Sequence, residues 1–152
     1  MIRPAHPTDA GSVAAILSQF IDTTDWMPRL YTRAEELSFA GLMVDRGWVS
    51  VAEPDGPGRG IAGFMALDAG FIHALYVAQH RRGQGVGQSL LERAKTGAAR
   101  LELNTFQANL AAQRFYARAG FREMGRGDGR GLGSVNDEGL PDLRLIWERN
   151  VA

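Results

Sequence analysis

The apolar residues in the first third of the chain follow the spacing of two helices. The first helix is predicted over residues 7–21, with Thr8 as its N-cap residue. Its apolar residues recur three or four positions apart, at Val13, Ile16, Leu17 and Phe20. The second helix is predicted over residues 33–46, with Thr32 as its N-cap residue. Its apolar positions include Leu37, Leu42 and Met43.

Shorter apolar runs, several of them alternating with polar residues, predict strands. The predicted strands are residues 1–5, 47–53, 61–67, 71–77, 101–105, 121–125 and 141–149. The turn sequence PDGPGRG joins the second and third of these into a hairpin. Two further helices are predicted, one over about 86–99 and one within 109–120 that ends at Gly120. This order of elements predicts one α/β domain over residues 1–152, with helices flanking a mixed sheet.

Composition excludes several kinds of function. The 152 residues are 45% hydrophobic and 22% charged with a formal net charge of zero, so bulk electrostatics favour neither nucleic acid nor an anionic membrane as a partner. The absence of cysteine excludes disulfides, thiolate metal ligands and a cysteine nucleophile. The first residues lack the apolar core of a signal peptide, and no apolar run reaches membrane-spanning length. We therefore expect a cytoplasmic protein.

The stretch RRGQGVGQSLLERAK, residues 81–95, places three glycines directly before a helix sequence. Unobstructed amides at a helix N-terminus bind anions, because the helix dipole is positive there. A Walker A loop would need a lysine where Gln88 stands, and a dinucleotide fingerprint needs a different glycine spacing. The remaining pattern is R-x-x-G-x-G, formed by Arg82, Gly85 and Gly87, which suits a pyrophosphate directly after a strand.

Two motifs in register carry a resemblance to a known family. LYVAQHRRGQGVGQSLLERA (75–94) resembles the acetyl-CoA motif of the GCN5-related N-acetyltransferases, and ELNTFQANLAAQRFYARAGF (102–121) resembles that family's next motif. The resemblance implies a single-domain α/β fold in which the fourth and fifth strands, 71–77 and 101–105, splay apart to hold acetyl-CoA. It implies direct transfer of an acetyl group to a primary amine, with no metal.

The resemblance also assigns residues to the cofactor. The backbone of Leu75 and Val77, with Tyr76 between them, would pair with the pantetheine arm as an added strand pairs with a sheet edge. The pyrophosphate would lie against Arg82, Gly83, Gln84, Gly85, Val86, Gly87 and Gln88. The residues expected at the cofactor from the following helix are Asn109, Ala112, Phe115 and Tyr116.

Direct acetyl transfer needs an oxyanion donor, an acid and a base. The resemblance gives the first role to the Leu75 amide and the second to Tyr116, for which a place in the core is the alternative. The base is open. His73 stands where relatives carry an acid, and its ordinary pKa of about 6.5 suits the role, although a core histidine is equally compatible with the sequence. Asp68, Glu53 and water are the other candidates.

The sequence defines the molecule that accepts the acetyl group less closely than it defines the cofactor. Trp26 and Met27, in the connection between the first two helices, are candidates for an acceptor pocket or for a plug over the core. A small-molecule amine and a protein amino group both fit, and the resemblance allows a homodimer. The altered polar positions of strand 71–77 leave a second reading open, a CoA-binding sensor without turnover. The glycine-rich segment 125–140 is a candidate cover for the site.

Overall fold

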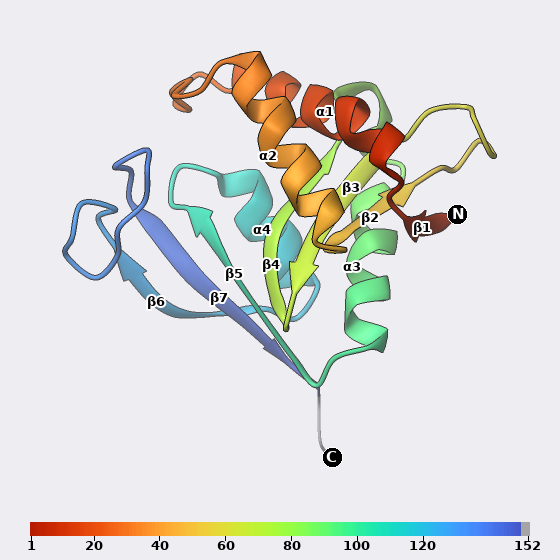
Figure 1. The fold of residues 1–152 in the computed structure, drawn as a ribbon. Helices are drawn as coiled ribbons and strands as arrows, with labels where there is room; N and C mark the ends of the chain where they lie inside the picture. The colour runs from red at the N-terminus through yellow and green to blue at the C-terminus, as the bar shows by residue number, and fades with distance from the viewer. Residues whose placement is uncertain (150–152) are drawn as a thin grey trace. The chain divides into compact units, whose positions relative to one another are not determined.

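The computed structural model describes residues 1–149 (Figure 1). Its α-helices are α1 (Ala10–Asp22), α2 (Arg33–Asp45), α3 (Val86–Thr96) and α4 (Leu110–Arg118), and its short 3-10 turns are η1 (Pro7–Asp9) and η2 (Gln79–Arg81). Its strands are β1 (Ile2–Pro4), β2 (Val49–Ala52), β3 (Gly63–Asp68), β4 (Phe71–Val77), β5 (Arg100–Phe106), β6 (Arg122–Gly127) and β7 (Asp142–Glu148). Every helix and strand predicted from the sequence is present, within a few residues of its expected ends.

The strands form one mixed sheet in the order β1-β2-β3-β4-β5-β7-β6. Strands β4 and β5 are parallel, with Phe71 opposite Glu102 and Ile72 opposite Leu103. The pairs β1–β2, β2–β3, β5–β7 and β6–β7 are antiparallel. The predicted α/β class with a mixed sheet is thereby confirmed, while the splaying of β4 from β5 stays a prediction.

The chain divides into two compact units. Unit 1 consists of Met1–Asp68 and His73–Ala94, and unit 2 consists of Ala69–Ile72 and the residues from Lys95 onward. Strand β4 contributes to both, because the division falls directly after Ile72. One domain over residues 1–152 remains a prediction.

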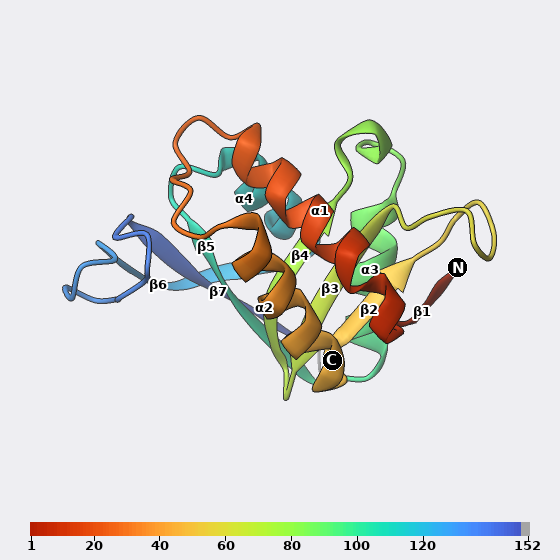
Figure 2. The same ribbon diagram turned by 45° about the horizontal axis from the view of Figure 1, so that its top comes forward.

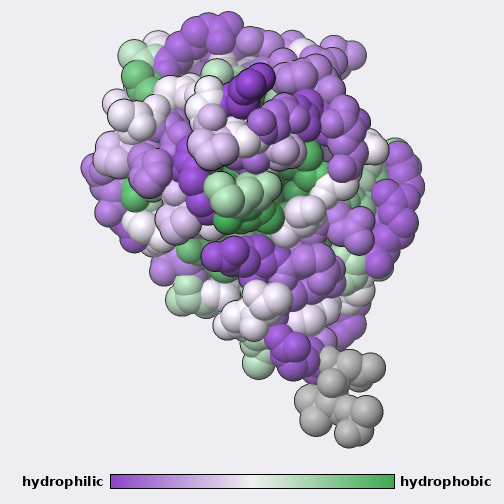
Figure 3. Space-filling view, turned by 90° about the vertical axis from the view of Figure 1, so that its right-hand side faces the viewer, coloured by the Kyte–Doolittle hydropathy of each residue, from purple (hydrophilic) through white to green (hydrophobic). Residues whose placement is uncertain are grey.

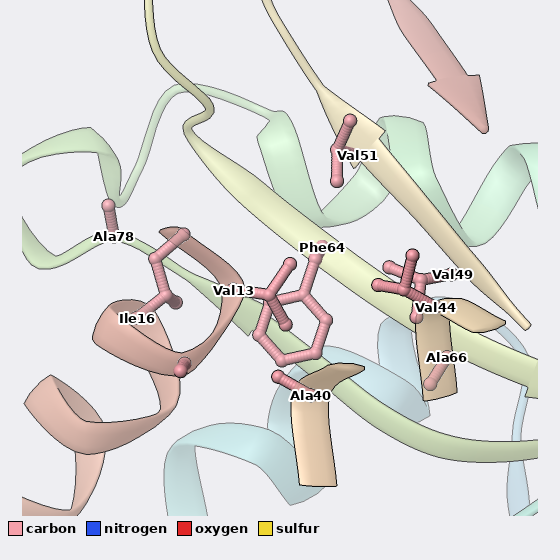
Figure 4. Close-up of a cluster of buried hydrophobic side chains, with 10 residues drawn as sticks. Val13, Ile16, Ala40, Val44, Val49, Val51, Phe64, Ala66 and Ala78 are labelled. Carbon is pink, nitrogen blue, oxygen red and sulfur yellow. The ribbon is translucent and has the colours of Figure 1, made fainter. Parts of the chain in front are cut away.

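In unit 1, α1 and α2 cover one face of the β2–β3 hairpin (Figure 2). The buried side chains between them are Val13, Ala14, Ile16, Ala40, Val44, Val49, Val51, Phe64, Ala66 and Ala78 (Figure 4). Gly63 lies on the opposite face of β3, where an added Cβ would be 3.1 Å from the Val86 side chain of α3. The apolar stripe predicted for α3 is buried as a whole: Val86, Leu90, Leu91 and Ala94.

Helix α2 meets this core with small residues. Ala40 and Val44 are buried, whereas Leu37 and Leu42 are 46% and 47% exposed. Of the apolar residues predicted for this helix, Met43 packs against the core and is partly buried, whereas Leu37 and Leu42 do not lie on the buried face. A small side chain at the contact lets the two helix axes approach more closely, which offsets the area that a leucine would have buried.

The first two helices begin with different capping interactions. Thr32 caps α2 as predicted, because its hydroxyl accepts from the Glu35 amide (3.1 Å) while the Glu35 carboxylate accepts from the Thr32 amide (3.0 Å). The prediction of Thr8 as the cap of α1 is wrong. Residues 7–9 form η1, and the Asp9 carboxylate accepts from the His6 amide (2.7 Å) instead.

Unit 2 is built on β5, β7 and β6, with α4 beside them. Asn104 of β5 lies opposite Arg144 of β7, and Arg144 lies opposite Gly125 of β6. Helix α4 ends before Gly120, whose φ of +94° confirms the predicted glycine cap. The segment after β6 is made of turns, in which the Asp128 carboxylate accepts from two following amides.

On the face shown in Figure 3, hydrophilic side chains predominate and surround a group of hydrophobic side chains near the centre of the view. Within residues 1–149, no helix combines the length and the apolar content needed to cross a membrane.

Candidate functional site

The glycine loop between β4 and α3 has a backbone that only glycine adopts readily. Gly83 and Gly85 have φ values of +76° and +81°, and a Cβ added at either would meet no atom within 4 Å. Conformation therefore requires these glycines, and the space above them is open. Gly87 lies inside α3 with an ordinary helical backbone.

The amides of this loop are available to a ligand. In the described part of the chain, the six backbone N–H groups of residues 83–88 have no acceptor, and the Gly85 carbonyl accepts from the Ser89 amide at the first turn of α3 (3.0 Å). Helix α3 has 11 residues, and its positive dipole end adds to the field of these amides. The loop thus fits an anion such as a pyrophosphate.

Neighbouring side chains hold the loop in place. The Arg81 guanidinium donates to the Gln84 side chain (2.9 Å) and to the Asp55 carboxylate (2.5 Å), which lowers the pKa of Asp55 below its ordinary value. The Gln79 amide donates to the Gln19 side chain of α1 (2.8 Å). Arg82 is exposed and, among residues 1–149, forms no ion pair. Gln84 therefore supports the loop, whereas Arg82 is positioned to meet an incoming anion.

The β4 residues expected at the cofactor, Leu75, Tyr76 and Val77, are partly exposed. The Tyr76 ring lies 4.9 Å from the Phe20 ring of α1, and Phe20 in turn lies 6.2 Å from Trp26, centroid to centroid. The structure thus brings Trp26, in the connection between α1 and α2, into one aromatic cluster with β4. Met27 follows in the same turn and is also partly exposed.

His73 is an exposed residue of β4, so the interpretation as a core histidine is wrong. Its imidazole stacks on the Trp48 indole at 4.5 Å, with 8° between the ring planes. The Arg46 guanidinium lies over the same indole at 5.0 Å. Trp48 was not among the predicted site residues, because it is 25 positions from His73 in the sequence and only the fold brings the two rings together.

The other candidate bases have different surroundings. Glu53 is buried, forms an ion pair with Arg3 and accepts from the Gly58 amide (3.3 Å), and the Arg3 contact lowers the pKa of Glu53. A carboxylate stabilised in this way is a weak base. Asp68 is exposed at the end of β3.

In unit 2, α4 carries the remaining candidates. The Asn109 side-chain oxygen caps α4 by accepting from the Ala112 amide (3.1 Å), which fixes the orientation of its amide group. Tyr116 is 7% exposed, and its ring meets Phe115 and Phe121 in edge-on contacts at 5.1 and 5.3 Å. The predicted site residues therefore fall into two groups, with β4 and the glycine loop on unit 1 and α4 on unit 2.

Unit 2 also contains a hollow of about 390 Å³, lined by residues of β5, β6 and β7 and by residues 133–135. Its charged side chains already have partners. Arg126 pairs with Glu123 (2.5 Å), and Arg144 donates to Asn104 (2.6 Å). The Asp142 carboxylate is buried and accepts from Asn136 (3.1 Å). The hollow thus suits a neutral polar group better than a free charge.

Comparison with known proteins agrees with this geometry. A family model described as an acetyltransferase (GNAT) domain matches residues 45–123. The chain is 34% identical over 148 residues to the peptidyl-lysine N-acetyltransferase YjaB of Salmonella typhimurium, with 96% of this chain and 97% of that protein covered. It is 30% identical over 145 residues to a 5-NmdU N-acetyltransferase of Pseudomonas phage PaMx11, with 92% and 94% covered.

The fold has close counterparts among solved structures. The solution structure of apo-form YjaB from Escherichia coli matches with a TM-score of 0.76 at 27% identity, covering 97% of this chain and 96% of that one. Since the family model matches more than half of the chain and a relative above 30% identity spans nearly all of it, the chain belongs to the GCN5-related N-acetyltransferase (GNAT) family.

Proposed function

We propose that this chain moves the acetyl group of acetyl-CoA directly to a primary amine, and that the amine is a lysine of a protein. The observation that carries the proposal is the row of six amides, at residues 83–88, for which residues 1–149 offer no acceptor. These amides and the exposed Arg82 would hold the pyrophosphate of CoA. The backbone of Leu75 and Val77 would hold the pantetheine arm in the manner of an added strand.

The reaction exchanges one bond to the acetyl carbon for another. The amine nitrogen forms the C–N bond, the C–S bond breaks, and the proton lost by the amine goes to a base. The Leu75 amide would stabilise the oxyanion that develops at the acetyl oxygen. Tyr116 would donate its phenolic proton to the departing thiolate, since a tyrosine is protonated at neutral pH.

We infer that His73 is the base, acting on the amine directly or through water. Its imidazole is exposed, and the stack on Trp48 holds the ring in one orientation. Glu53 is a poorer choice because Arg3 already neutralises it. The proposal for a protein acceptor rests on the peptidyl-lysine activity named for the Salmonella relative. The phage relative, at 30% identity, is named for a different acceptor, 5-NmdU.

The donor site is tested by replacing Gly85 with alanine and measuring CoA binding by calorimetry. Gly60→Ala is a matched control, because Gly60 also has a positive φ (+88°) and open space around its Cα. Both variants should lose about 1–2 kcal/mol of stability from the left-handed backbone. Only Gly85→Ala should weaken CoA binding, by roughly tenfold or more, because the loop amides turn away from the pyrophosphate.

Equal CoA affinity in the two variants, or no CoA binding by the unmodified protein, would refute the donor site. Thiol release from acetyl-CoA is then measured with single-lysine peptides and with small amines. Release with peptides alone supports a protein acceptor. CoA binding without release on any amine would make the chain a sensor instead of an enzyme.

A further inference from the structure

Lys95 is the one lysine of the sequence, in which Lys and Arg together number 17. It lies in the last turn of α3 and belongs to unit 2. Its ammonium donates to the Ala119 carbonyl at 2.5 Å and lies 5.2 Å from the centroid of the Trp147 ring. The side chain is partly buried by these contacts. Lys95 is therefore a structural cation inside a small cluster.

The position calls for a positive charge. Ala119 is the C-cap residue of α4, where backbone carbonyls have no helical partner and carry the negative end of the dipole. The indole face of Trp147 favours a cation as well. Lys95 thus joins the end of α4 to β7 through charge-dependent contacts.

Arg149 and Gly120 border the same Trp147 ring. The Arg149 guanidinium lies 5.7 Å from the Trp147 centroid and donates a hydrogen bond to the Lys95 carbonyl at 2.6 Å. A Cβ added to Gly120 would lie 3.4 Å from Trp147 Cδ1, at ordinary van der Waals distance.

Acetylation would remove what the cluster depends on. A C–N bond would form between the acetyl carbon and Nζ, and the bond from the acetyl carbon to the sulfur of acetyl-CoA would break. Of the two protons that the ammonium loses, one would go to the departing thiolate and the other to water. The product is uncharged and keeps one N–H of the original three, so it loses both the dipole and the cation–π attraction.

We propose that Lys95 is an inhibitory acetylation site, at which an acetyl group releases the C-terminal end of α4 and lowers the activity of the chain. Helix α4 carries Asn109 at its start and Tyr116 in its last turns. Loosening it disturbs both residues. The expected loss of turnover rests on the proposed function. The expected release of the C-terminal end of α4 does not depend on that function.

The test compares Lys95→Gln, which is neutral like acetyl-lysine, with Lys95→Arg, which keeps the charge. Arg118→Gln is the control for loss of a cation at the end of α4, because Arg118 is exposed in the same last turn. Lys95→Gln should lower Tm by about 2–4 °C or more relative to Lys95→Arg, and lower turnover at least threefold. Arg118→Gln should leave both close to the values of the unmodified protein.

A second arm uses the protein itself, acetylated with acetic anhydride and mapped by peptide mass spectrometry. Because Lys95 is the only lysine, modification there is separated from modification of the Met1 amine by the peptide that carries it. Protein acetylated at Lys95 should match Lys95→Gln in Tm. Equal Tm values for Lys95→Gln and Lys95→Arg, or an unchanged Tm after acetylation of Lys95, would overturn the proposal even if the chain proves to have no transferase activity.

Discussion

At the scale of single residues, the two side chains proposed to move protons have opposite surroundings. The His73 imidazole is exposed and held by a parallel stack on Trp48. The Tyr116 ring is buried between two other aromatic rings. An exposed base can reach an incoming amine, while a ring fixed by packing keeps its hydroxyl in one direction. Each residue should therefore affect turnover through a different proton transfer.

The two roles are tested with Tyr116→Phe and His73→Gln. Tyr116→Phe should lower turnover about a hundredfold and leave CoA affinity unchanged, because the ring and its packing remain. His73→Gln should lower turnover at neutral pH, because a glutamine side chain cannot accept the proton that the amine loses. The measurement is kcat against pH for both variants. Unchanged kcat in either variant removes that residue from its proposed role.

At the scale of elements, Arg3 connects three segments of unit 1. Its guanidinium, from β1, pairs with Asp9 of η1 (2.8 Å) and with Glu53 just after β2. These hydrogen bonds lower the pKa of both carboxyls below their ordinary values. A carboxyl with a lowered pKa in the folded state stabilises the fold above its ordinary pKa, and this contribution is lost as the pH falls through its folded pKa.

Arg3→Met should therefore reduce Tm at neutral pH, and the difference from the unmodified protein should shrink as the pH falls below about 4. The measurement is Tm between pH 2 and pH 7, within the range where folding is reversible. Arg122→Met serves as the control, because the Arg122–Glu148 pair is exposed on both sides. Parallel Tm curves for Arg3→Met and the unmodified protein would contradict the role of this cluster.

At the scale of the whole molecule, the two compact units share one strand. Residues 71–72 of β4 belong to unit 2 and residues 73–77 to unit 1. Because part of β4 belongs to each unit, unfolding of either unit removes pairing partners of the same strand. We therefore expect the units to unfold in one transition.

CoA should raise the Tm of that single transition. At a concentration of about 100 times Kd, a ligand that binds only the folded state adds roughly 2.7 kcal/mol, which corresponds to about 5–10 °C for a chain of this size. Differential scanning calorimetry with and without CoA measures both the number of unfolding transitions and the shift in Tm. Two separate transitions, of which CoA shifts one, would show that the chain has two domains and would contradict the single domain expected from the sequence.

The sequence was informative wherever a structure depends on residues close together in the chain. The four buried residues of α3 follow from helical spacing alone. The glycine-rich composition predicted a permissive loop, and the structure shows that Gly83 and Gly85 are the two glycines of this loop with a positive φ. Helix α2 shows the limit of such reasoning. Leu37 and Leu42 are exposed because the small residues Ala40 and Val44 fit the contact with the neighbouring elements, and no spacing within the segment reveals that choice.

The sequence by itself determined the order of elements, the glycine loop that opens α3 and the family to which the chain belongs. These properties depend on backbone preferences and on short motifs, which act over a few residues. Only the tertiary structure decided that His73 stacks on Trp48, that Arg3 neutralises Glu53 and that Lys95 holds the end of α4. Each of these contacts joins segments more than 20 residues apart, where side-chain neighbours are chosen by packing and charge in three dimensions.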